Sequence, residues 1–258
     1  MLRTPRRVVV VAPHPDDESI ATGGLLLRLN DAGAEIRVAF LTDGENNPWP
    51  HRAMLRRWHL TDSDRARYAA IRRDEAREAL SILGLPSDSA RFLGFPDQGL
   101  LRLFRRNPSA ISSAIERLLE DFHPDLIVAP SATDLHSDHF AAALVVRAAR
   151  ASYECEALAY VVHRWSRPDQ SSFRILLTAR ERERKRRAIS AHKTQMVLSR
   201  ERWLRYADVD EHLIDPGEPA PVVGRSLLRC WFIVRSEIAA RSFHSARPSE
   251  PARSPELA

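Results

Sequence analysis

Strand-like and helix-like segments alternate along the first two thirds of the chain, and this alternation constrains the fold more than any other feature. Short apolar segments predict strands at residues 8–12, 36–42, 91–95, 126–129 and 157–162. Amphipathic segments between them predict helices at residues 19–31, 69–83, 109–122 and 136–151. Strands that are joined through helices pair in parallel and are covered on both faces. The sequence therefore predicts an α/β fold with a mostly parallel central sheet.

The chain after residue 163 is less regular, but it contains no clear linker. Strands are expected at residues 173–177, 209–214 and 228–234, and one long helix at residues 179–198. From residue 245 onward, proline alternates with Ser, Arg and Glu, a composition typical of a frayed terminus. We therefore expect one domain over residues 1–244 and a flexible tail over residues 245–258.

Apolar segments in this chain are too short to span a membrane. The longest, residues 8–13 and 227–234, fall below the ~20 residues that a membrane helix needs. The basic N-terminus is not followed by a signal-peptide pattern. Two cysteines cannot build a disulfide framework, and they fit a reducing compartment. We expect a cytoplasmic protein without stable membrane insertion, and the oligomeric state stays open.

The net charge is +5, and all but two of the 39 basic residues are arginine. A GC-rich genome would explain this bias, but an anionic partner such as nucleic acid would also suit it. The most basic segment, residues 180–187, alternates with acidic residues and is interpreted as a solvated helix face with ion pairs. We therefore expect no nucleic-acid partner.

The strongest functional signal directly follows the first predicted strand. Residues 12–18 read Ala-Pro-His-Pro-Asp-Asp-Glu and precede a predicted helix. A single Asp at this position would be expected to cap that helix. One imidazole and three carboxylates within five residues, however, disrupt the strand and helix patterns alike. His14, Asp16 and Asp17 are therefore candidate functional residues.

A second cluster, His-Ser-Asp-His at residues 136–139, follows the fourth predicted strand. The second and third strands also end in polar residues, at 42–45 and 94–97. In open α/β sheets, ligands bind beyond the carboxyl ends of the strands, where the strand order reverses. We expect the four strand ends to gather polar side chains at one edge of the sheet.

Two imidazoles and one carboxylate suit a divalent cation of the zinc class with positions left open for water. His14 and Asp17, with either His136 or His139, would supply these ligands. The remaining carboxylate and imidazole would then be free for proton transfer.

The segment 46–63 is irregular and lies between a predicted strand and a predicted helix. A loop of this length is uncommon unless it is functional. Trp49, His51 and Trp58 within it either form a stacking lip for a sugar or aglycone or pack on the body of the protein. Residues 163–165, after the fifth strand, would reach the same edge of the sheet.

Together these motifs resemble the LmbE/PIG-L family of metal-dependent N-deacetylases. His-Pro-Asp-Asp-Glu at 14–18 and His-Ser-Asp-His at 136–139 carry the resemblance. The segments 42–45, 72–76 and 92–97 and, more weakly, 188–195 also agree with it. The resemblance implies a Rossmann-like three-layer sandwich and a Zn²⁺-dependent hydrolase, although Fe²⁺ or another divalent metal would also suit. It further implies a small amino-sugar or glycoconjugate substrate that loses an N-acetyl or N-acyl group.

The resemblance also implies individual roles around the metal. His14, Asp17 and His139 match the metal ligands, and a metal-bound water would be the nucleophile. Asp16 matches the general base. His136 is expected to be the protonated residue that faces the developing oxyanion or the leaving amine.

Three further positions follow from the same resemblance. Asp138 is expected to orient or tune His136, and Arg72 and Asp97 match positions that hold sugar hydroxyls in characterised relatives. One departure concerns a tyrosine that assists catalysis in some members. This chain has Asp134 at the corresponding position, so such help is absent or comes from elsewhere.

Two other classes compete with the hydrolase. A non-haem Fe(II) oxygenase would use His14, Asp16 and a distant histidine as its ligands, but that triad usually lies in a double-stranded β-helix rather than in alternating strands and helices. An arginine-rich nucleic-acid-binding domain would give no reason for acidic and histidine clusters at strand ends.

Overall fold

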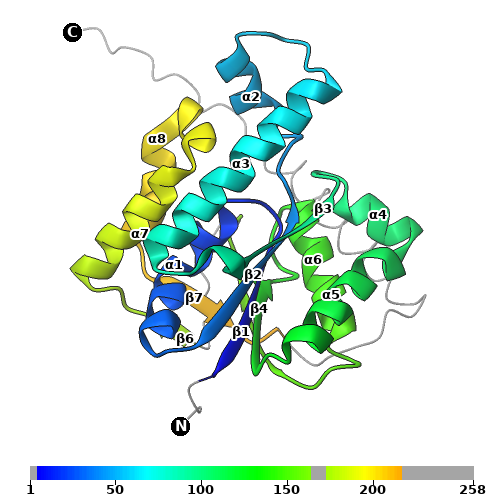
Figure 1. The fold of residues 1–258 in the computed structure, drawn as a ribbon, viewed down its shortest axis with the longest axis vertical. Helices are drawn as coiled ribbons and strands as arrows, with labels where there is room; N and C mark the ends of the chain where they lie inside the picture. The colour runs from blue at the N-terminus through cyan, green and yellow to red at the C-terminus, as the bar shows by residue number, and fades with distance from the viewer. Residues whose placement is uncertain (1–4, 164–172, 217–258) are drawn as a thin grey trace, which may run out of the picture. The chain divides into compact units, whose positions relative to one another are not determined.

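A seven-stranded sheet lies at the centre of the computed structural model, in which residues 5–163 and 173–216 are described. Its strand order is β3-β2-β1-β4-β5-β7-β6 (Figure 1). The strands are β1 (Arg7–Ala12), β2 (Glu35–Thr42), β3 (Ala90–Phe95), β4 (Leu126–Pro130), β5 (Glu156–Tyr160), β6 (Phe173–Ile175) and β7 (Glu211–Ile214). The first five strands pair in parallel, and β7 is antiparallel to β5 and β6. The predicted α/β fold with a mostly parallel sheet is confirmed.

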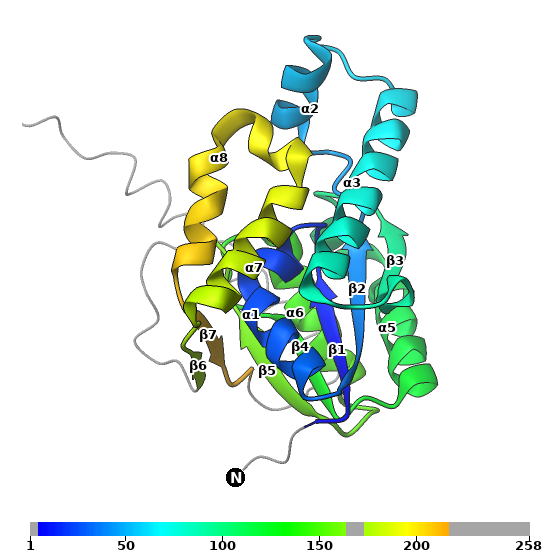
Figure 2. The same cartoon turned by 60° about the vertical axis from the view of Figure 1, so that its left-hand side comes forward.

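Helices cover both faces of this sheet, as the predicted three-layer sandwich requires. Figures 1 and 2 show α1, α3 and α7 on one face and α4, α5 and α6 on the other. The helices are α1 (Asp17–Asp31), α2 (Pro48–Leu55), α3 (Asp62–Leu83), α4 (Leu100–Arg106), α5 (Pro108–Phe122), α6 (Ser137–Ala149), α7 (Ala179–Ala191) and α8 (Lys193–Asp208).

β1 is buried along almost its whole length, because it lies between β2 and β4 and under both helical layers. The four valines of β1, at positions 8 to 11, are fully buried. A continuous apolar run is the expected sequence of a strand that is covered on both faces. The loop after β1 therefore leaves from the middle of the sheet edge.

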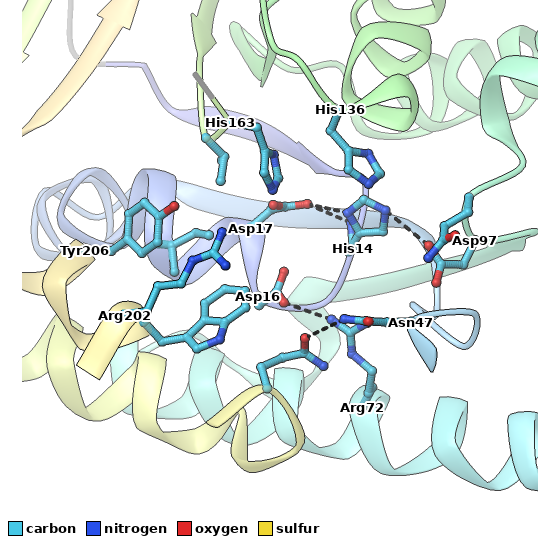
Figure 3. Close-up of a pocket in the computed structure, with 15 residues that line it drawn as sticks. His14, Asp16, Asp17, Asn47, Arg72, Asp97, His136, His163, Arg202 and Tyr206 are labelled. Carbon is cyan, nitrogen blue, oxygen red and sulfur yellow. Dashed lines mark hydrogen bonds and ion pairs between the residues drawn. The ribbon is translucent and has the colours of Figure 1, made fainter. Parts of the chain in front are cut away.

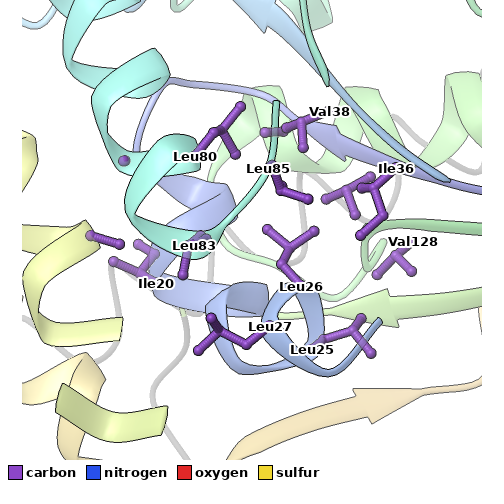
Figure 4. Close-up of a cluster of buried hydrophobic side chains, with 14 of the residues drawn as sticks. Ile20, Leu25, Leu26, Leu27, Ile36, Val38, Leu80, Leu83, Leu85 and Val128 are labelled. Atoms are coloured by element: carbon purple, nitrogen blue, oxygen red, sulfur yellow. The ribbon is translucent and has the colours of Figure 1, made fainter. Parts of the chain in front are cut away.

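Leucines of α1 and α3 form much of the core on one face of the sheet. Leu26 and Leu27 of α1 lie beside Leu80 and Leu83 of α3, over Val38 of β2 (Figure 4). Burying one such side chain typically contributes about 1.5–3 kcal/mol to stability. This packing fixes α3, the helix that carries one of the predicted site residues.

The prediction for residues 46–63 is wrong in part, because the segment contains the helix α2. Pro48 occupies its first turn, where the missing amide hydrogen is not needed. The helix α4 was not predicted either. It is only seven residues long, too short for its apolar residues to show a clear helical period.

The single helix predicted over residues 179–198 is instead two helices, α7 and α8. His192 has φ −77° and ψ 63° and interrupts the helical geometry between them. The interpretation of residues 180–187 as a solvated face also needs correction. Lys185 is buried, and its Nζ donates to Glu211 of β7 at 2.7 Å.

Some expectations lie outside the described residues. These are the strand at 228–234, the tail at 245–258, and residues 164 and 165. Within the described part of the chain, none of the helices has the length and apolar character that a membrane span requires.

Candidate metal centre and active site

The two polar motifs meet where the strand order of the sheet reverses. β1 pairs with both β2 and β4, so the chain leaves these neighbouring strands toward α1 on one face and α6 on the other. This is the position at which open α/β sheets bind ligands. Residues 14–18 follow β1 and residues 136–139 follow β4, and the fold therefore brings the two motifs together (Figure 3).

The carboxylate of Asp17 lies between two imidazoles. Its Oδ2 atom is 3.2 Å from His14 Nδ1 and 3.2 Å from His139 Nε2. The backbone N–H of His14 also donates to this oxygen, at 2.9 Å. Asp17 and His139 are almost fully buried, and His14 is partly exposed. The three residues predicted as metal ligands are therefore in mutual contact.

The donor set fits a divalent cation. Among the described residues, His139 Nε2 has no hydrogen-bond partner, although Asp17 Oδ2 is only 3.2 Å away. His14, His136 and His139 also offer nitrogen atoms within 4.8 Å of one another. Burial opposes ionisation of Asp17, but the neighbouring imidazoles hold its pKa well below the ordinary value. Such a set can hold a metal ion with imidazole and carboxylate ligands.

Asp134 holds the second imidazole in place, a role that the sequence analysis missed. It is buried, and its carboxylate lies 3.1 Å from His139 Nδ1. The same carboxylate accepts backbone N–H groups of His136, Val162 and His163 at 2.7–3.1 Å. A carboxylate on the far nitrogen of a ligating histidine fixes its ring and tautomer. The sequence signal that could have indicated this role is the position of Asp134, two residues before the first His of the motif.

Asp16 lies beside the centre with a strained backbone, at φ 142°. Arg72 Nη2 donates to Asp16 Oδ2 at 2.9 Å. Burial raises the pKa of Asp16 to about 6, even though Arg72 opposes the shift. At neutral pH the group is therefore mostly ionised yet basic enough to accept a proton.

The surroundings of His136 oppose the imidazolium form that the resemblance implies. Burial and the imidazoles of His14, His139 and His163 lower its pKa to about 4. Its Nδ1 accepts the backbone N–H of Asp138 at 3.2 Å, so the proton of the neutral ring lies on Nε2.

The Asp138 carboxylate faces elsewhere. Its Oδ2 is 3.5 Å from His14 Nε2, and its Oδ1 accepts the N–H of Leu100 at 3.1 Å. Asp138 therefore contacts His136 through its backbone and His14 through its side chain.

Comparison with known proteins decides which family this arrangement represents. The model of the family described as PIG-L, GlcNAc-PI de-N-acetylase, matches residues 9–150. The chain belongs to this PIG-L family.

The curated relatives of this chain include deacetylases. The 1D-myo-inositol 2-acetamido-2-deoxy-alpha-D-glucopyranoside deacetylase of Rhodococcus opacus is 32% identical over 160 residues, which are 56% of this chain. The match spans about half, 53%, of the length of that relative. The Mycobacteroides abscessus protein of the same name is 27% identical over 273 residues, with 86% of this chain and 96% of the relative covered.

Solved structures agree with the PIG-L fold. A conserved protein from Thermus thermophilus superposes with a TM-score of 0.57 and 27% identity, over 84% of this chain and 96% of its own. The N,N'-diacetylchitobiose deacetylase of Pyrococcus horikoshii has a TM-score of 0.58 at 20% identity, over 81% and 83% of the two chains. The family match and the open, mostly parallel sheet do not favour the oxygenase or the nucleic-acid-binding alternative.

Arg72 and Asp97 both border the centre. Arg72 comes from α3 and donates to the carbonyl oxygens of Pro15 and Gly44 besides Asp16. Gly44 has φ 67°, and a Cβ there would lie 1.7 Å from Arg72 Nη1. Asp97, after β3, lies 3.3 Å from His14 Nε2.

A cavity of about 260 Å³ opens over the candidate metal centre. This volume lies just below the ~300–1,000 Å³ range that is typical of small-molecule sites. Its wall includes Asn47 of the 46–63 segment and His163 after β5. The α8 side of the cavity is formed by Gln195, Arg202, Trp203 and Tyr206. Gln195 ends the segment 188–195 that agrees with the resemblance, but no pattern in the sequence predicted that α8 would line a cavity. In Figure 3, Arg202 and Tyr206 lie on the side opposite Asp97.

The aromatic residues Trp49, His51 and Trp58 of the 46–63 segment do not line the described cavity. His51 is buried and stacks on Tyr68 with ring centroids 4.3 Å apart. Trp49 and Trp58 are exposed, and the guanidinium of Arg52 lies near both rings. Packing on the body of the protein therefore holds for His51, whereas the two exposed tryptophans neither pack there nor line this cavity.

Proposed function

We propose that this chain is a Zn²⁺-dependent deacetylase that hydrolyses the N-acetyl group of a small amino-sugar conjugate. The observation that supports it most directly is the Asp17 carboxylate in contact with His14 and His139. The curated relatives named above are deacetylases of an acetamido sugar. The small cavity over the centre suits a substrate of that size.

His14, Asp17 and His139 would hold the metal, with Asp134 orienting His139. An amide has a weakly electrophilic carbonyl and a poor leaving group. A bound Zn²⁺ supplies Lewis-acid polarisation of the carbonyl and lowers the pKa of a water molecule to roughly 7. The protein residues must then move protons and stabilise charge.

Asp16 is the proposed general base. It lines the cavity, is next in sequence to a proposed ligand, and has a pKa near 6. It would take the proton of the attacking water and later deliver it to the departing amine. Base assistance of this kind typically contributes ~10²–10⁴-fold to the rate.

His136 is the proposed donor to the oxyanion. Its neutral ring carries the proton on Nε2, because Nδ1 accepts the N–H of Asp138. A preorganised N–H aimed at developing negative charge stabilises the transition state in a site from which water is excluded.

Arg72 and Asp97 are the proposed contacts for sugar hydroxyls. The carboxylate of Asp97 accepts the N–H of Asn46 at 2.8 Å and borders the cavity. Arg72 Nε is buried and has no hydrogen-bond partner among the described residues. Arg72 and Asp97 thus place one guanidinium and one carboxylate along this side of the cavity.

The test is release of free amine from a panel of N-acetylated amino sugars by the purified protein. We expect activity that a chelator abolishes and that Zn²⁺ restores. Fe²⁺ and Mn²⁺ in place of Zn²⁺ would reveal a different metal preference, and oxoglutarate consumption would instead indicate the oxygenase. Failure to release amine from any acetamido sugar at full metal loading would refute the proposal.

A further inference from the structure

We propose that His192 is a positioning residue for the base Asp16 and that it acts through the buried carboxylate of Glu18. The inference rests on the proposed function, in which Asp16 takes a proton from water. It assigns a role to the α7–α8 junction, which the proposed reaction has so far not used.

The backbone at Asp16 needs support from its surroundings. Its φ of 142° and ψ of −30° lie in a region that residues other than glycine rarely adopt. Such a conformation persists only where neighbouring groups impose it. On the carbonyl side, Asp16 accepts the N–H groups of Ser19 and Ile20 as the N-cap of α1.

Glu18 supplies the support on the amide side. The N–H of Asp16 donates to Glu18 Oε2 at 2.9 Å. Glu18 is fully buried, and a buried carboxylate is costly unless donors surround it. Its other oxygen, Oε1, accepts Ser19 Oγ at 2.7 Å and contacts His192 Nε2 at 3.0 Å. The carboxylate therefore bridges the strained amide and the α7–α8 junction.

His192 can make this contact because the chain departs from helical geometry there. The break between α7 and α8 coincides with His192, whose side chain reaches α1 and is 1% exposed. Its Nδ1 has no hydrogen-bond partner in the described part of the chain, so the polar contacts of the ring are made through Nε2. Burial alone would lower the pKa of His192, but the carboxylates of Glu18 and Asp16 raise it.

Two independent supports thus meet at the base. Arg72 holds the Asp16 carboxylate, and Glu18, backed by His192, holds the Asp16 backbone. Loss of the imidazole would leave Glu18 without one of its two side-chain donors and free it to turn. Asp16 would then be displaced relative to the water, while the three proposed metal ligands would stay in place. A displacement of about 1 Å can cost ~10²-fold in rate.

The variants His192→Ala and His192→Gln test the proposal. For the alanine variant we expect kcat to fall by about 10- to 100-fold, with KM and bound zinc unchanged. The glutamine variant keeps a donor for Glu18 and should recover most of kcat. In an Asp16→Asn background, His192→Ala should cause little further loss, because both changes act on the same step.

Thr194→Val is the matched control. Thr194 is 1% exposed, belongs to the same junction, and bonds to Glu75 rather than to Glu18. We expect this change to lower the melting temperature while kcat stays near wild type. The backbone amide resonance of Asp16 gives a readout that does not depend on turnover. It should shift in His192→Ala and return toward its original position in His192→Gln.

Two outcomes would overturn the inference. One is an unshifted Asp16 amide resonance in His192→Ala. The other is a fall in kcat by the same factor when His192→Ala is introduced into the wild-type protein and into the Asp16→Asn variant. If the wild-type protein released no amine, the proposed function would fail, but the amide resonance would still decide whether His192 holds Asp16.

Discussion

The Asp134 carboxylate lies 3.1 Å from Nδ1 of His139 and is buried with it. This contact leaves Nε2 of the same ring facing Asp17. Removing the partner of a metal-bound histidine typically costs 10–100-fold in metal affinity. For Asp134→Asn we therefore expect zinc affinity to fall by about that factor, measured by competition with a chromophoric chelator.

Asp62→Asn is the control for this prediction. Asp62 is fully exposed at the start of α3, and its ion pair with Arg65 lies at the surface. We expect its zinc affinity to equal that of wild type. Unchanged affinity in folded Asp134→Asn would mean that the carboxylate does not orient the ligand.

Asp16→Asn should separate metal binding from catalysis. The amide keeps the shape of the side chain and can still accept from Arg72, but it cannot take a proton. We expect kcat to fall by ~10²–10⁴-fold, while zinc content measured by mass spectrometry stays at the wild-type ratio. Asp43→Asn is the matched control. The Asp43 carboxylate directly follows β2 and pairs with Arg73. Near-full turnover in Asp16→Asn would exclude Asp16 as the base.

The pairing of Glu181 with Arg28 predicts a pH dependence of stability. Hydrogen bonds from Arg28, together with those from Thr178, lower the pKa of Glu181 from 4.5 to about 2. A carboxylate whose pKa is lower in the folded state stabilises the protein above its unfolded pKa. This contribution is complete above pH 4.5 and is lost as the pH falls toward 2.

Glu181→Gln is expected to lower the free energy of unfolding by about 1 kcal/mol at pH 7. The difference from wild type should shrink between pH 4.5 and 2, as followed by urea denaturation at several pH values. Glu183→Gln, on the same helix but largely exposed, should show little difference at any pH. A constant difference for Glu181→Gln down to pH 2 would contradict the assignment.

The sequence predicted the position of the centre because that position depends on local patterns. Alternating strands and helices determine which strand ends share an edge, and residues 14–18 and 136–139 both follow buried strands. Once β1 and β4 are neighbours, contact among His14, Asp17 and His139 follows with little further information.

Features that depend on distant packing were not predictable in this way. The lowered pKa of His136 depends on burial and on three other imidazoles that only the folded chain brings near it. The α8 wall depends on the break at His192 and on β7 returning antiparallel to β5. A pattern of apolar residues records none of these long-range relationships.

The buried pair of Lys185 and Glu211 predicts a large effect on stability without an effect on chemistry. Lys185 Nζ donates to Glu211 Oε1 at 2.7 Å, and Glu211 also accepts the N–H groups of Gly24 and Leu25. Lys185→Met leaves a buried carboxylate without its cation, which typically costs 3–5 kcal/mol. We expect that loss in urea denaturation, with zinc affinity unchanged. Adding Glu211→Gln to Lys185→Met should recover part of the lost stability. If Lys185→Met alone were as stable as wild type, the ion pair would not hold α1, α7 and β7 together.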